Sequence, residues 1–101
     1  MKVALIGMGS VGRGVSHVLK NDSRFKIVAA ADSKSGTVNP DGLDIDRLLQ
    51  AKKDTGRIGT PDWTAFRIAA EVDYDVLVEV TPTNAETGEP ALSTIKIALS
   101  R

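Results

Sequence analysis

The chain has 101 residues, enough for one hydrophobic core but too few for two domains. Its 13 basic and 13 acidic residues balance, so the basic excess typical of nucleic-acid-binding proteins is absent. Cysteine is absent too, which excludes disulfides, cysteine zinc sites and thiol nucleophiles. No apolar run approaches the roughly 18 residues that a membrane-spanning helix needs. We therefore expect one cytoplasmic domain over residues 1–101 that binds neither nucleic acid nor a membrane.

The first part of the chain alternates between strand and helix patterns. A buried strand is expected from Lys2 to Ile6, where aliphatic residues follow one another up to a glycine. A helix is expected from Ser10 to about Asn21, because apolar residues then recur at helical spacing, at Val11, Val15, Val18 and Leu19. A second strand is expected from Phe25 to Ala31, and a loop from Asp32 through Gly42.

The same alternation continues through the second half. A helix is expected from Asp44 to about Asp54, with Asp44 as its N-cap, an apolar stripe at Ile45, Leu48 and Leu49, and Gly56 as its stop. The other expected elements are a very short strand at Arg57–Thr60, a helix that begins after Pro61-Asp62 and runs to about Glu71, a strand at Asp75–Val80, a loop at Thr81–Glu89 and a helix from Pro90. Long crossovers between apolar strands indicate a mostly parallel sheet with helices on both faces.

A glycine-rich turn joins the first strand to the first helix. The residues Gly7-Met-Gly-Ser-Val-Gly12 match G-x-G-x-x-G, and Asp32 ends the next strand, about 20 positions further on. In this strand–turn–helix context the pattern is typical of dinucleotide binding, and the alternative is a glycine turn without a ligand. The fold class predicted is therefore a Rossmann-type three-layer α/β/α fold with a mostly parallel sheet.

Each glycine of the turn has an expected mechanical role. Gly7 permits a sharp exit from the strand, Gly9 leaves room for a pyrophosphate, and Gly12 lets the helix pack against the first strand. Gly14 is interpreted as a second close-packing position, because a glycine inside a helix costs ~1 kcal/mol relative to alanine. The pyrophosphate is expected at the backbone N–H groups that begin the helix, around Ser10 and Val11.

The residues after the second strand bear on the choice of dinucleotide. Asp32 is expected to accept a hydrogen bond from the adenosine ribose 2′-OH, which favours NAD, since a 2′-phosphate would meet a like charge. Ser33, Lys34 and Ser35 follow directly, and Arg13 lies just past the last fingerprint glycine. These side chains are candidates for binding a 2′-phosphate. Taken alone, each basic side chain is better explained as solvated surface charge. The balance favours NAD, with NADP as the alternative.

Several segments resemble homoserine dehydrogenases. The narrowest is Asp75-Val-Leu-Val-Glu-Val-Thr-Pro-Thr-Asn84, followed by Thr87-Gly-Glu-Pro-Ala-Leu92, which resembles the end of that family's nucleotide domain. Broader support comes from Gly7–Gly14, Ala31–Gly36, Asp41–Asp44 and Lys52–Gly56. The resemblance implies an oxidoreductase that interconverts homoserine, a small amino-acid substrate, and aspartate 4-semialdehyde with NAD(P). It also implies that Thr81, Pro82 and Thr83 lie near the nicotinamide ribose.

The resemblance further implies that the catalytic lysines and the substrate and dimerisation domain lie beyond Arg101. No catalytic or metal-binding residue is therefore assigned, and this chain alone is expected to be inactive. His17 is interpreted as a solvated surface residue, and the role of Glu79 stays open. The strand Asp75–Val80 would have an open edge, so a homo-oligomer is expected. Two alternatives remain: another Rossmann reductase, similar to dihydrodipicolinate reductase, or a non-catalytic module that binds or senses dinucleotides.

Overall fold

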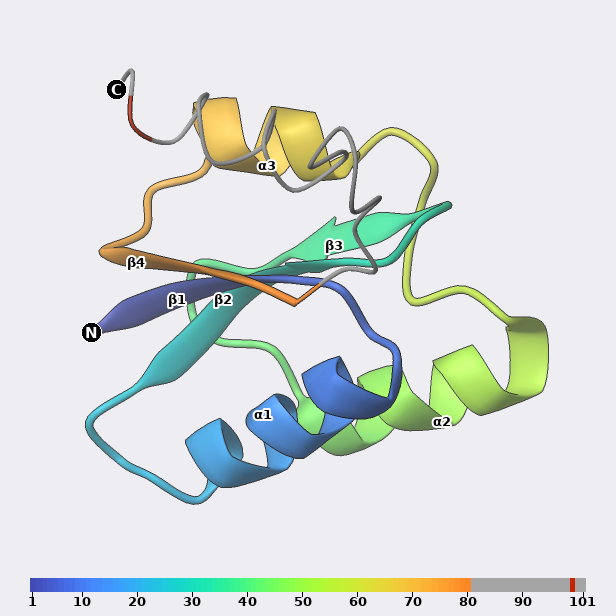
Figure 1. The fold of residues 1–101 in the computed structure, drawn as a ribbon, viewed down its shortest axis with the longest axis horizontal. Coiled ribbons are helices and arrows are strands. Elements are labelled where there is room, and N and C mark those ends of the chain that lie inside the picture. Colours follow the sequence, from blue (N-terminus) through green and yellow to red (C-terminus); the bar gives the residue numbers. More distant parts are fainter. Residues whose placement is uncertain (81–98, 100–101) are drawn as a thin grey trace, which may run out of the picture.

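The computed structural model describes residues 1–80 and residue 99, without the side chains of Ser10 and Val11, and places a sheet between two layers of helices (Figure 1). The sheet has the order β3-β2-β1-β4. Its strands are β1 (Lys2–Ile6), β2 (Lys26–Ala31), β3 (Gly36–Val38) and β4 (Val76–Glu79). β1 is parallel to both β2 and β4, whereas β3 is antiparallel to β2.

Three helices cover the two faces of this sheet. Helices α1 (Ser10–Lys20) and α2 (Ile45–Thr55) lie on one face, and α3 (Ala65–Glu71) lies on the other (Figure 1). The arrangement confirms the predicted α/β fold, and the strand expected near residues 75–80 lies beside β1.

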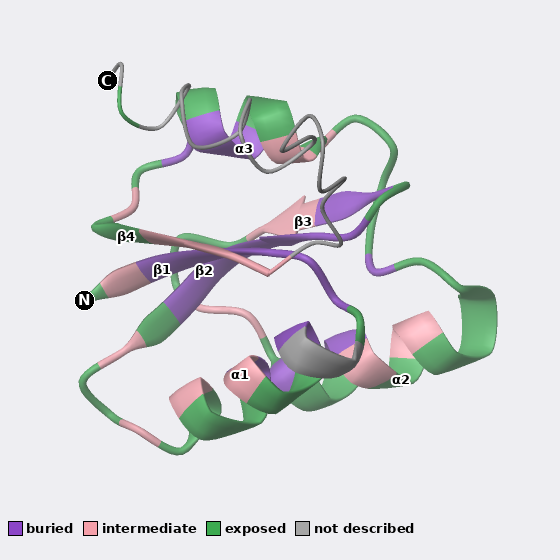
Figure 2. Cartoon of the chain, in the orientation of Figure 1, coloured by how far each residue is buried: buried purple, intermediate pink, exposed green. Residues whose placement is uncertain are grey.

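The core has two parts because the strands are buried on both faces (Figure 2). Side chains alternate along a strand, so Val3 and Leu5 of β1 face one layer and Ala4 and Ile6 face the other. The first pair packs in a cluster with residues of α2, and the second pair packs in a cluster with Ile68 of α3. The same short strand therefore contributes to both clusters.

Local signals fix the ends of α2 and α3. The Asp44 side chain accepts a hydrogen bond from the Arg47 N–H at 3.2 Å, which makes Asp44 the N-cap of α2, as predicted. Gly56 ends α2 with a φ of 77°, in the left-handed region that glycine adopts without strain. Thr64 caps α3 by accepting from the Arg67 N–H at 3.1 Å.

The loop predicted from Asp32 to Gly42 is wrong in its middle. Residues Gly36–Val38 form β3, which pairs with β2 in the register Ala31↔Gly36 to Ala29↔Val38. A three-residue strand is too short to show a period of two, so only its partner reveals it. The short strand expected at Arg57–Thr60 is reduced to a single bridge between Gly36 and Thr60.

Helix α3 confirms the helix expected after Pro61-Asp62: it spans Ala65–Glu71, with Thr64 as its N-cap. One further prediction needs correction. Val18, placed on the core stripe of the first helix, is 70% exposed, whereas Val15 and Leu19 pack against the core. The expected loop at Thr81–Glu89 and most of the final helix lie outside the described residues. Among the described residues, no helix is long and apolar enough to cross a membrane.

Candidate functional site

The glycine turn lies where the carboxyl ends of three strands meet. Gly7 follows β1 with a φ of 110°, a conformation that strongly favours glycine, as expected for a sharp exit from the strand. Its N–H donates to the Ala31 carbonyl at the end of β2, at 2.7 Å. The Val80 N–H, just past β4, donates to the Ile6 carbonyl at 2.8 Å. In open α/β sheets ligands bind at this carboxyl edge.

Gly12 holds helix α1 close to the turn. A Cβ added at Gly12 would lie 2.1 Å from the Gly7 carbonyl oxygen and 3.4 Å from a methyl of Val80. No side chain fits against a backbone atom at that distance, so the predicted role of Gly12 in close packing is confirmed.

Gly9 is different, because nothing within the described protein requires a glycine there. Its φ of −75° and ψ of −162° are open to any residue, and an added Cβ would meet no atom within 4 Å. Gly9 is the N-cap of α1 and provides no side-chain hydrogen bond to the helix, and the first turn of α1 carries no acidic residue. The missing Cβ thus leaves open space at a positive helix end, an arrangement that fits a pyrophosphate.

Gly14 does not have the close-packing role predicted for it. It is exposed, and an added Cβ would again meet no atom of the described residues within 4 Å. A glycine two positions after a close-packing glycine faces a different side of the helix, since successive residues rotate by about 100°.

Asp32 lies at the same sheet edge, directly after β2, and its side chain is only 4% exposed. Oδ1 accepts three hydrogen bonds, from the Lys34 N–H at 2.8 Å, the Ser35 N–H at 2.6 Å and the Ser35 hydroxyl at 3.0 Å. Oδ2 accepts from Lys52 Nζ at 2.9 Å. Burial is the largest single influence and acts to raise the pKa of Asp32, but the hydrogen bonds from Lys52, Lys34 and Ser35 together outweigh it and hold the pKa below 3.8. The carboxylate is therefore charged at neutral pH.

Lys52, the ion-pair partner of Asp32, was missed from the sequence, and the hydrogen bond by which Ser35 holds Asp32 was not predicted. The Ser35 hydroxyl donates to Asp32 and accepts from the Ile58 N–H at 3.0 Å, which links the loop to the segment after α2. Lys52 had a detectable signal: it follows Ile45 and Leu48 at the spacing of the buried stripe of α2. A lysine on such a stripe calls for an acidic partner.

The other predicted site residues lie in different parts of the structure. Ser33 and Lys34 are exposed beside Asp32. Arg13 is exposed on α1 and lines a groove of about 410 Å³ together with His17, Lys52 and Lys53. His17 is exposed, in agreement with a surface position. The backbone of α1 includes Ser10 and Val11, and Thr81, Pro82 and Thr83 lie outside the described residues. Residues 1–80 and 99 contain no group of His, Asp and Glu that could hold a metal ion.

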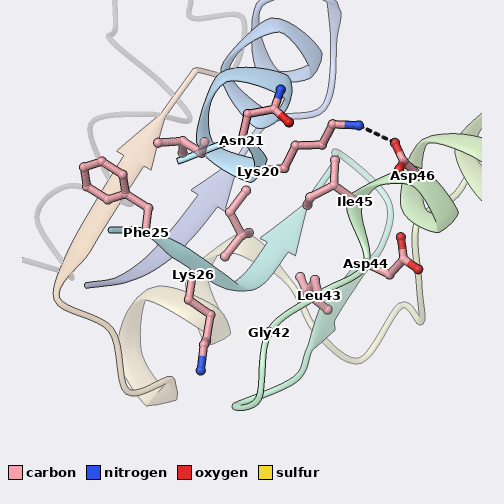
Figure 3. Close-up of a pocket in the computed structure, with 11 residues that line it drawn as sticks. Lys20, Asn21, Phe25, Lys26, Gly42, Leu43, Asp44, Ile45 and Asp46 are labelled. Atoms are coloured by element: carbon pink, nitrogen blue, oxygen red, sulfur yellow. Dashed lines mark hydrogen bonds and ion pairs between the residues drawn. The ribbon is translucent and has the colours of Figure 1, made fainter. Parts of the chain in front are cut away.

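A second cavity, of about 440 Å³, lies away from this edge, at the amino end of β2 (Figure 3). It is lined by the end of α1, the start of β2 and the start of α2. The Lys20–Asp46 ion pair, 2.6 Å long, closes one side of it (Figure 3). The fingerprint residues do not line this cavity, so it is separate from the candidate site.

A mostly parallel sheet, a glycine turn that opens a helix, and an acidic residue at the end of the next strand together define the Rossmann-type nucleotide domain of dehydrogenases. The chain belongs to the Glutamate/Leucine/Phenylalanine/Valine dehydrogenase family, whose sequence profile matches residues 1–95.

Individual relatives narrow this classification. A homoserine dehydrogenase of Methanocaldococcus jannaschii is 38% identical over 104 residues, which cover 90% of this chain and 31% of that protein. A glutamate dehydrogenase of Thermotoga maritima is 33% identical over 79 residues, covering 75% of this chain and 19% of that protein. A solved structure assigned as a homoserine dehydrogenase of Archaeoglobus fulgidus superimposes with a TM-score of 0.83 at 31% identity, covering 100% of this chain and 32% of that one. The resemblance to homoserine dehydrogenases is thus confirmed, and the chain spans about a third of their length.

Proposed function

We propose that this chain binds a nicotinamide dinucleotide, NAD or NADP, as the nucleotide-binding domain of a homoserine dehydrogenase. The observation that carries the proposal is Gly9. Within the described residues neither its backbone conformation nor its packing needs a glycine, yet the space left by the missing Cβ opens at the uncapped start of α1. A pyrophosphate that approaches the backbone closely would occupy that space.

Different residues of this chain would contact different parts of the cofactor. The first N–H groups of α1, at Ser10 and Val11, would bind the pyrophosphate, and Asp32 would face the adenosine ribose. By the family resemblance, Thr81, Pro82 and Thr83 would lie by the nicotinamide ribose. When bound, the oxidised dinucleotide supplies the hydride acceptor for alcohol oxidation. The residues of this chain hold and orient that cofactor.

Calorimetry with the oxidised dinucleotides tests this proposal. Gly9→Val should abolish measurable binding, because its side chain fills the space that the pyrophosphate needs. Gly14→Val is the matched control, since an added side chain also meets open space there. Equal affinities of the two variants, or a folded parent chain that gives no heat at millimolar nucleotide, would overturn the proposal.

Two amino-acid substrates are favoured by different relatives. Homoserine is favoured by the Methanocaldococcus and Archaeoglobus relatives, and glutamate by the family profile and the Thermotoga relative. In the intact protein that carries this chain, NAD(P)H formation with L-homoserine against L-glutamate separates them. We expect turnover with homoserine, and turnover with glutamate alone would assign the second function.

The assembly we propose is a homo-oligomer of a domain that spans residues 1–101. Among the described residues β4 has one strand neighbour, β1, so its other edge offers backbone hydrogen bonds to a second copy. Sedimentation of this chain should show dimers or larger species that depend on concentration. A monomer whose Val76–Glu79 amides exchange freely would rule out this contact. The cytoplasmic location stays a prediction.

A further inference from the structure

Helix α1 has two flanks beside the face that packs on the sheet. The flank toward α2 is polar, since Arg13 and His17 line the groove between the two helices. Successive residues of a helix rotate by about 100°, so Gly14 and Val18 lie toward the opposite flank. Val18 is 70% exposed, and a Cβ added at Gly14 would meet no atom of the described residues within 4 Å. This flank of α1 is therefore uncovered by the described residues.

The contacts of α2 show which strand the free flank of α1 faces. The Leu43 N–H, just before α2, donates to the Ile27 carbonyl of β2 at 2.8 Å. Near the other end of α2, Lys52 pairs with Asp32, which directly follows β2, at 2.9 Å. Both ends of α2 are thus held at β2, with α1 beside it on the same face of the sheet (Figure 1). Since β1 and then β4 follow β2 in the sheet, the flank of α1 away from α2 faces β4.

Strand β4 presents valines to the same side of the sheet. Val76 and Val78 are in register with Val3 and Leu5 of β1, which face the α1 layer. Paired residues of neighbouring strands point to the same face, so the two valines face that layer too. Val76 is 36% exposed and Val78 is half-buried. We call the apolar surface between helix and strand the α1–β4 corner, formed by Gly14, Val18, Val76 and Val78.

A second copy of this chain fits the α1–β4 corner poorly. If two copies paired their β4 edges, the two β1 strands would lie three strand spacings apart, about 14 Å. Helix α1 lies over β1 and β2, so the two α1 helices would be further apart than the roughly 8–10 Å at which helices pack. Direct packing of one α1 on another is also opposed by charge, because α1 carries Arg13, His17 and Lys20 and no acidic residue.

We propose that the α1–β4 corner is the docking surface for an amphipathic helix of the same polypeptide, supplied by the part of the relatives' length that this chain does not cover. The chain covers 31% and 32% of its homoserine dehydrogenase relatives, so ample polypeptide exists in proteins of that length. The docked helix packs an apolar stripe on the valines, approaches α1 most closely at Gly14, and carries acidic side chains toward Arg13 and His17. Gly14 then has a close-packing partner that the described residues lack. The proposal is independent of dinucleotide binding.

Thermal unfolding of Gly14→Leu in two forms of the protein tests this docking. In this chain the substitution should leave Tm unchanged or raise it, because leucine favours a helix more than glycine and meets open space. In the intact protein that carries this chain it should lower Tm by at least ~4 °C, because the side chain overfills the contact with the docked helix. The control Arg47→Leu adds a leucine at an exposed position of α2 and should change neither Tm by more than ~2 °C.

Hydrogen exchange of the unsubstituted proteins gives a second measurement that does not depend on a variant folding. On going from this chain to the intact protein, amide exchange in α1 should slow at least ~10-fold more than exchange in α2, because only α1 gains a covering helix. Equal slowing of the two helices, or the same Tm change for Gly14→Leu in both forms, would overturn the proposal. A Gly14→Leu loss in this chain alone that disappears on dilution would assign the corner to a second copy and overturn it as well.

Discussion

The glycines of the turn and of helix α1 occupy distinct environments although the motif presents them alike. Gly12 touches the backbone of Gly7, Gly9 borders open space at a helix end, and Gly14 is exposed in the helix. The sequence predicts the first two roles from spacing alone. It fails for Gly14 because spacing cannot show what a helix face packs against.

These environments predict opposite effects of alanine on stability. Gly12→Ala should lower the free energy of unfolding by ~1–3 kcal/mol, because its Cβ meets the Gly7 carbonyl oxygen and helix or turn must shift. Gly14→Ala should raise it by up to ~1 kcal/mol, because alanine restricts the unfolded chain and nothing opposes its Cβ. Urea unfolding followed by circular dichroism measures both. A loss of stability in Gly14→Ala would show that this helix face is covered.

Asp32 and Lys52 show how far single residues can be predicted. The position of Asp32 follows from the fingerprint, but its environment depends on α2, which begins more than ten residues later. The lysine on the α2 stripe signals that some acid is buried nearby without saying which one. The ion pair of Asp32 with Lys52 depends on the path of the chain from β2 through the antiparallel strand β3 to α2, and local sequence does not encode that path.

At the scale of elements, helix ends are better predicted than short strands. Asp44 and Gly56 were placed correctly because caps act within a few residues of the chain. Strand β3 was missed because its three residues gain their stability from pairing with β2, a contact that local sequence does not encode. The helix expected after Pro61-Asp62 begins at Ala65, because the Thr64 side chain caps it.

The two candidate caps of α3 can be separated by substitution. Thr64→Ala should cost ~1 kcal/mol of stability, because the Thr64 hydroxyl oxygen accepts from the Arg67 N–H at 3.1 Å and satisfies one of the free amides of the helix. Asp62→Ala should cost much less, since the Asp62 contact to Arg67 uses its backbone carbonyl, which alanine keeps. Thermal unfolding of the two variants compares them directly. A larger loss in Asp62→Ala would show that Asp62 and not Thr64 caps the helix.

For the whole molecule, the order of apolar strands and helices was sufficient to predict the layered sheet. Strands that are apolar throughout must be covered on both faces, and the long crossovers make β1, β2 and β4 parallel. The sequence could not predict that the outer strand β3 would be antiparallel. Side chains alternate between the two faces along each strand, so β1 contributes residues to both core clusters.

That shared strand predicts that the two faces unfold together. Ile45 belongs to the cluster on the α2 side, whereas Trp63 packs against the cluster on the α3 side. Ile45→Val should lower stability by ~0.5–1.5 kcal/mol, as expected for the loss of one buried methylene. Because β1 and β2 carry the loss across the sheet, Trp63 fluorescence and far-UV circular dichroism should report the same lowered urea midpoint. Val18→Ala, at a position 70% exposed, is the control and should leave both midpoints near the parent value. A Trp63 transition that stays at the parent midpoint while the circular dichroism transition moves would show that the two layers unfold separately.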